Sequence, residues 1–221
     1  MNLEELLQIT PWIHASFGII CIFSGLLALT AKKRRGRHSN AGRIFAVSLT
    51  FAFAAILLNL IIRKNVFMFG LGWLAVYTGI EGWRALLRFK GSLPQQPTVF
   101  DYLFGSLTLL ISVGLFVFGV RVFIQSKNPM GFVCILFGVL GVSVLRKTWQ
   151  RYKTIASGKK WLKFHIDMML AAFSAAVTAF LAVQFSGHLG DFEWVVWVTP
   201  TLVLSRYGSY EAKRRGLRAT Q

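Results

Sequence analysis

The sequence predicts an all-α protein: one transmembrane domain over residues 1–221, a polytopic bundle of seven helices with the N-terminus outside and the C-terminus in the cytoplasm. Two observations about composition favour this class. Hydrophobic residues make up 55% of the chain and charged residues only 15%, whereas soluble domains carry about 25% charged residues. The apolar residues are also gathered into blocks, and a helix needs roughly 20 such residues to cross the hydrocarbon.

Polar or basic segments separate the apolar blocks from one another. We expect helices over about residues 11–30, 44–62, 66–83, 102–124, 129–145, 164–185 and 193–210. Because seven spans use about 140 residues, little of the chain is left for a separate soluble domain.

The first three blocks have charged boundaries. Glu4 and Glu5 precede the first block, and this segment lacks the positive residues of a signal peptide, so we expect the block to remain as a helix. The basic loop 32–38 separates the first block from the second. The turn 63–65, Arg-Lys-Asn, separates the second from the third.

The last four blocks are separated in the same way. A loop with two prolines precedes the fourth block, and a polar turn follows it. Pro129 comes next. Proline is favourable in the first turn of a helix, because backbone N–H groups there have no acceptor within the helix and the missing N–H of proline costs nothing. The segment 146–163 is the most basic loop, and the Gly-containing turn 186–192 precedes the last block.

The basic residues lie mainly on one side of this layout. All but four of the 25 Lys and Arg residues fall on the side of the loops after the first, third and fifth blocks and of the C-terminal tail, and the exceptions are Arg63, Lys64, Arg121 and Lys127. Such a bias fixes orientation, with the basic side in the cytoplasm. It also accounts for the net charge of +17 without a nucleic-acid partner, and we expect anionic lipids at the cytoplasmic face instead.

Four ionisable residues are expected near the cytoplasmic edge: His38, Glu81, His165 and Asp167. Because ionisable groups inside a bilayer are costly, their shared depth predicts a polar site for an ion, a proton or a small ligand. The alternative is that the carboxylates only neutralise neighbouring arginines or lysines and that His165 caps a helix end. His14, near the outer end of the first block, is a separate candidate.

Two cofactors are compatible with these histidines. His38 and His165 are candidate ligands for a divalent metal, although no HExxH or CxxC spacing accompanies them. A haem-binding electron carrier is the alternative, with His14 paired to His188 and His38 to His165 as axial ligands. No catalytic residue is predicted, because the sequence has neither a nucleophile elbow nor a phosphate-binding glycine loop.

Small residues recur at three- and four-residue spacings in several blocks, for example Gly131, Gly138 and Gly141 in the fifth. Such stripes let helix backbones approach closely in lipid. They favour packing inside one bundle, and contact between copies in a homo-oligomer is the alternative. A third functional alternative is a membrane assembly or lipid-interaction protein that uses the basic face.

Short motifs in both halves of the chain carry a family resemblance. They are His14-x-x-x-Gly18, His38-x-x-x-Gly42-Arg43-x-Phe45, Trp161-Leu162-Lys163-x-His165-x-x-x-Met169 and Trp197-x-x-Pro200. In this order they resemble a family of small bacterial multi-pass proteins, known as predicted membrane proteins with a domain of unknown function. The resemblance implies a bundle in the bacterial cytoplasmic (inner) membrane and no particular activity. It matches His14, His38 and His165 to the family's recurring histidines, whereas Ser39 stands where the family often has arginine.

Overall fold

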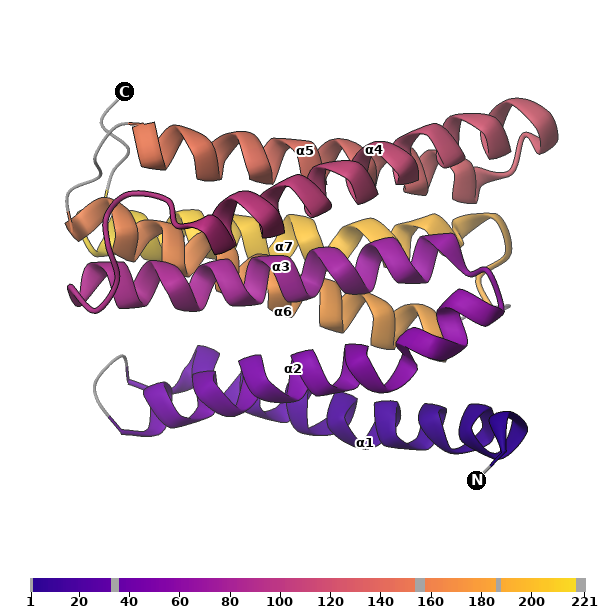
Figure 1. Cartoon of the computed structure of the whole chain (residues 1–221), viewed down its shortest axis with the longest axis horizontal. Coiled ribbons are helices and arrows are strands. Elements are labelled where there is room, and N and C mark those ends of the chain that lie inside the picture. The colour runs from indigo at the N-terminus through magenta and orange to yellow at the C-terminus, as the bar shows by residue number, and fades with distance from the viewer. Residues whose placement is uncertain (1, 33–35, 154–157, 186–187, 218–221) are drawn as a thin grey trace.

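The computed structural model describes residues 2–32, 36–153, 158–185 and 188–217, and every long element in these ranges is an α-helix (Figure 1). The helices are α1 (Leu3–Thr30), α2 (Arg37–Ile62), α3 (Val66–Phe89), α4 (Val99–Ser126), α5 (Pro129–Lys153), α6 (Gly158–Phe185) and α7 (Glu193–Arg214). A short 3₁₀ turn, η1 (Gly190–Phe192), leads into α7. The predicted all-α fold with seven long helices is therefore confirmed for the described residues.

Several predicted helix ends were wrong, because the helices continue beyond the apolar blocks. α1 begins at Leu3 rather than near residue 11, since Asn2 and Glu5 exchange reciprocal side-chain-to-backbone hydrogen bonds of 2.8 and 3.0 Å that cap its first turn. The other extensions lie at the opposite end of the bundle: α2 and α6 begin earlier, and α3, α5 and α7 end later, than predicted. Apolar length marks only the part of a helix within the hydrocarbon.

Five helices in the described part of the chain are long and apolar enough to cross a membrane: α1, α2, α4, α5 and α6. This supports a multi-pass membrane protein. α3 is outside this group and carries Glu81, Arg84 and Arg88 near its C-terminal end. α3 is nevertheless central, because it packs against α2, α4 and α6.

Successive helices run in opposite directions along the bundle (Figure 1). α3 and α6 lie side by side between the α1–α2 hairpin and the α4–α5 hairpin, and α7 packs on α6. The C-terminal ends of α1, α3, α5 and α7 therefore gather with the N-terminal ends of α2, α4 and α6. We call this end the basic end, because it holds Arg37, Lys90, Lys153, Lys163 and Arg214 among other cations.

The glycines of α5 are used for packing within the bundle. A Cβ atom at Gly131 would lie 2.6 Å from the Phe123 nitrogen, and one at Gly138 would lie 2.8 Å from the Phe116 nitrogen. Since both neighbours are backbone atoms of α4, only glycine allows the two helices to approach this closely. The small-residue stripe of the fifth block is thus an internal seam between α4 and α5.

Candidate functional site

Asp101, in the first turn of α4, is held by two arginines of α3. Arg84 donates from Nε to Oδ1 and from Nη2 to Oδ2, each at 2.9 Å, and Arg88 donates from Nη2 to Oδ2 at 2.8 Å. The Thr98 nitrogen and hydroxyl donate to the same Oδ2 at 2.6 and 2.7 Å. Asp101 is buried, and these ion pairs and hydrogen bonds offset the cost of removing its carboxylate from water.

Arg88 is buried among groups from three other parts of the chain. Its Nε donates to the Pro94 carbonyl oxygen at 3.1 Å, and its guanidinium lies 4.9 Å from the centre of the Tyr152 ring and 5.3 Å from the centre of the Trp161 ring. Its Nη1 has no hydrogen-bond partner among the described residues. Arg88 therefore ties α3 to α5, α6 and the connection before α4.

Glu81 completes this cluster but is held less tightly. The Tyr152 hydroxyl donates to Asp101 Oδ1 at 3.0 Å and lies 3.4 Å from Glu81 Oε2. Glu81 Oε1 is 4.0 Å from Arg84 Nε. We call Glu81, Arg84, Arg88, Asp101 and Tyr152 the ion network, which places two guanidinium groups next to two carboxyl groups.

The two histidines at the basic end are oriented by backbone carbonyl groups. His38 Nδ1 is 2.8 Å from the Ala28 oxygen on α1, and His165 Nδ1 is 2.8 Å from the Gly82 oxygen on α3. Since a carbonyl oxygen only accepts, Nδ1 is the donor in each ring, and in the neutral form the lone pair resides on Nε2. A metal-binding histidine is commonly oriented by this kind of bond.

His38 and His165 line one cavity of about 550 Å³ at the basic end, between α1 and α2 on one side and α3, α6 and α7 on the other. Its buried lining is apolar apart from Glu211 and includes Phe45, Leu170 and Phe173. Its exposed lining consists of Arg43, Lys90 and Arg215 together with Phe89. The cavity therefore combines a hydrocarbon interior with a charged outer part.

Three basic side chains of the lining, Arg43, Lys90 and Arg215, are exposed, and the one carboxylate of the lining, Glu211, is buried. Arg215 Nε donates to Glu211 Oε1 at 2.7 Å. Neither Arg43 nor Lys90 forms a salt bridge with any residue that the structure describes. The lining is consequently positive overall.

The four residues predicted to share a site are divided by the structure. His38 and His165 come together at the cavity, whereas Glu81 belongs to the ion network toward α4 and α5. Asp167 accepts a hydrogen bond from Lys163 Nζ at 2.7 Å on the same helix, and both side chains are partly exposed. His14 is on α1 toward the opposite end of the bundle, where its Nδ1 lies 2.9 Å from the Ala52 oxygen.

The cavity alone does not supply a full set of metal ligands. Within the described ranges, no three His, Cys, Asp or Glu side chains converge on one point. A divalent cation held by His38 and His165 would take its remaining ligands from outside the chain, since such ions bind four or more groups.

Sequence reasoning missed Glu211 and Arg215 as cavity residues, because the last helix was expected to end at residue 210. α7 instead continues to Arg214, and Gly216 (φ 65°) closes it, with the Leu217 nitrogen bonded to the Ala212 oxygen at 2.9 Å. The feature of the sequence that indicates this later helix end is Gly216, because helices commonly end at a glycine.

The chain was also compared with known proteins. No protein-family model matches it, and neither does any curated protein or solved structure. A functional proposal therefore depends on the cavity and the ion network.

Proposed function

We propose that this chain is an integral membrane protein that binds a small ligand in the cavity lined by His38 and His165. The observation that carries the proposal is that these two histidines, from α2 and α6, line the same cavity of about 550 Å³. That volume is within the range of about 300–1,000 Å³ typical of small-molecule sites. Mostly apolar walls with a few placed polar groups are also typical of such sites.

In this proposal all seven helices cross the inner membrane of a bacterial cell, with the N-terminus outside and the basic end in the cytoplasm. The cations support this orientation, because among the residues that the structure describes only Arg63, Lys64, Arg121 and Lys127 lie away from the basic end. A fluorescent protein fused after residue 221 should be fluorescent in the cytoplasm, and alkaline phosphatase fused there should be inactive. An active phosphatase fusion would contradict the orientation.

Filling the cavity tests whether it binds a ligand. Gly42 lines the cavity, and a Cβ atom there would have no neighbour within 4 Å, so Gly42→Leu should occupy the space without a clash. Gly114→Leu on α4 is the matched control, since Gly114 is equally open but exposed and outside the cavity. Native mass spectrometry in mild detergent should detect a bound molecule on the original chain and on Gly114→Leu, but not on Gly42→Leu.

Haem is a second candidate, because the two histidines that line the cavity have their Nδ1 atoms engaged by carbonyl groups. In that case His38 and His165 would hold the haem iron. Protein purified from cells grown with ample haem precursor should then show a Soret band that His38→Ala and His165→Ala each abolish. A purified chain without that band would end this candidate and leave the binding of another ligand intact.

A further inference from the structure

We infer that the ligand of the cavity is an anionic amphiphile: a molecule with a negatively charged headgroup on a hydrocarbon chain. The headgroup would lie at the basic end, and the chain would run toward the middle of the bilayer. This inference rests on the proposed function, because it names the chemistry of a ligand for the same cavity. Three properties of the surrounding residues support it.

The first property is the charge at the outer part of the cavity. Arg43 of α2 and Lys90, the residue that caps the C-terminal end of α3, are both exposed and both line the cavity. Glu211 is already bound by Arg215, so these two cations remain without a carboxylate among the described residues. Basic side chains at the depth of the lipid headgroups attract phosphate and carboxylate groups.

The second property is the hydrocarbon character of the inner part. Phe45, Leu170 and Phe173 are buried there, and Met169 and Ile166 line the same cavity. These side chains offer carbon contacts and no hydrogen-bonding groups. Such a wall suits an acyl or isoprenoid chain, whereas a sugar or a nucleotide would leave many polar groups without partners.

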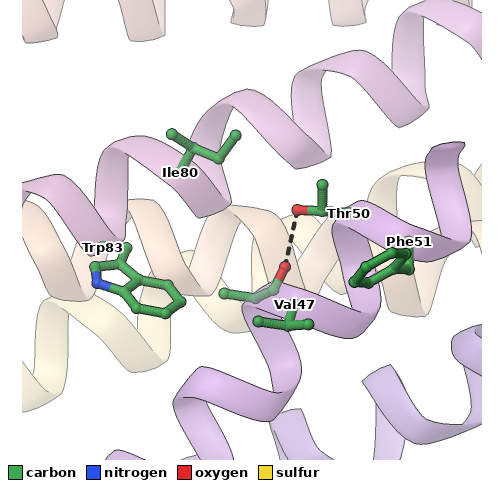
Figure 2. Close-up of a pocket in the computed structure, with 6 residues that line it drawn as sticks. Val47, Thr50, Phe51, Ile80 and Trp83 are labelled. Carbon is green, nitrogen blue, oxygen red and sulfur yellow. Dashed lines mark hydrogen bonds between the residues drawn. The ribbon is translucent and has the colours of Figure 1, made fainter.

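The third property is a lipid-facing groove next to the cavity. Figure 2 shows Val47, Thr50 and Phe51 of α2 facing Ile80 and Trp83 of α3 across this groove. The groove has a volume of about 240 Å³. The Thr50 hydroxyl donates to the Ala46 oxygen at 2.9 Å, so its polar hydrogen is already satisfied. The groove is therefore lined almost entirely by apolar groups.

Trp83 joins the two spaces, because it lines both the groove and the cavity. Along α3, Ile80 in the groove is ten residues from Lys90 at the mouth of the cavity, or roughly 15 Å at the rise of an α-helix. Half of the hydrocarbon thickness is also about 15 Å. An amphiphile with its headgroup near Lys90 and Arg43 could thus extend its chain to mid-bilayer depth along α2 and α3.

The experiment measures binding to the full chain in nanodiscs of phosphatidylcholine. Phosphatidylglycerol is incorporated in one series, and oleate is added in another, so the two sources of an anionic amphiphile are distinguished. The number of retained anionic molecules is read by native mass spectrometry and the affinity from the thermal shift. We expect saturable binding of one molecule. The double variant Arg43→Ala/Lys90→Ala should weaken its affinity about 30-fold, because each basic residue near the headgroups contributes about 1 kcal/mol to the attraction.

Two control variants separate this site from general attraction to the basic end. Arg63→Ala/Lys64→Ala removes two cations from the opposite end of the bundle, and Gly114→Leu adds a side chain to an open lipid-facing glycine. Both should bind anionic amphiphile as the original chain does. Equal weakening by the two double variants would overturn the inference, because the attraction would then not belong to the cavity.

Failure of the inference and failure of the proposed function give different results. If phosphatidylcholine binds as tightly as the anionic probes, and Gly42→Leu abolishes both, the cavity binds a ligand but the charge assignment is wrong. If Gly42→Leu leaves the binding of every probe and of any co-purified molecule unchanged, the proposed function fails as well. Binding of phosphatidylglycerol alone would identify a bilayer lipid, and binding of oleate alone would identify a free single-chain acid.

Discussion

Arg88 and Asp101 form an ion pair of 2.8 Å in which the two residues are only 1% and 4% exposed. Neither charge can return to water while the helices stay packed, so each depends on its partner. Arg84 shares the same carboxylate through two further hydrogen bonds. The pair therefore fixes how the C-terminal part of α3 sits against the start of α4.

Asp101→Asn should destabilise the fold strongly, because Glu81, whose contacts are longer, would be the one carboxylate left near the guanidinium groups of Arg84 and Arg88. Removing one member of a buried pair costs about 3–5 kcal/mol, and this loss should appear in the free energy of unfolding measured in mixed detergent–SDS micelles. Asp167→Asn is the matched control, since its pair with Lys163 is partly exposed and such pairs contribute about 1 kcal/mol or less. Equal losses in the two variants would contradict this role for Asp101.

Glu81→Gln should be much milder than Asp101→Asn. The contacts of Glu81 are longer, at 3.4 Å to the Tyr152 hydroxyl and 4.0 Å to Arg84, and an amide oxygen can still accept from that hydroxyl. The expected cost is about 1 kcal/mol, the size of one ordinary hydrogen bond. The same unfolding titration checks it, and a cost as large as that of Asp101→Asn would make Glu81 the main counter-ion of the arginines.

Gly138→Ala should separate α4 from α5 locally. Its methyl group would meet the Phe116 backbone at 2.8 Å, and overpacking of this kind costs about 1–3 kcal/mol. Gly114→Ala on α4 meets no atom within 4 Å and should be neutral or slightly stabilising, because alanine is the better helix former. Thermal midpoints of the two variants should therefore shift in different directions or by clearly different amounts.

Trp83 should report on an acyl chain in the groove. Phospholipids brominated on their chains quench nearby tryptophans, so Trp83→Phe should lower the quenchable part of the fluorescence of the seven tryptophans. Trp161→Phe is the comparison, because Trp161 is fully enclosed next to Arg88 and out of reach of lipid. If Trp83→Phe left the quenching unchanged, the chain would not enter between α2 and α3.

The number of helices and the charge asymmetry of the chain were predictable because both depend on composition along the sequence. The grouping of His38, Glu81, His165 and Asp167 was not, because depth in a membrane says nothing about direction around a helix axis. Glu81 and the cavity residue Trp83 are separated by roughly 200° on α3 at 3.6 residues per turn. Knowing which face meets α4 and which meets α2 requires the packing of the whole bundle.

Helix ends were the other weak point, and α7 shows why. Its last turn carries Lys213 and Arg214, and from sequence alone these charges indicate a polar tail. The helix continues through them because Glu211 pairs with Arg215, and Gly216 ends it with a left-handed backbone conformation. Charged residues near a helix C-terminus favour helix continuation when they are basic. Hydrophobicity alone does not contain that information.

α3 presents the ion network on one face and part of the cavity wall on the other, through Trp83 and Lys90. A ligand that binds only the assembled bundle stabilises it by mass action, and the α3–α4 contact is part of that assembly. Ligand occupancy of the cavity and the free energy of unfolding of the bundle should consequently change together. Loss of Asp101, which does not line the cavity, would then weaken affinity in proportion to the fraction of bundles that come apart.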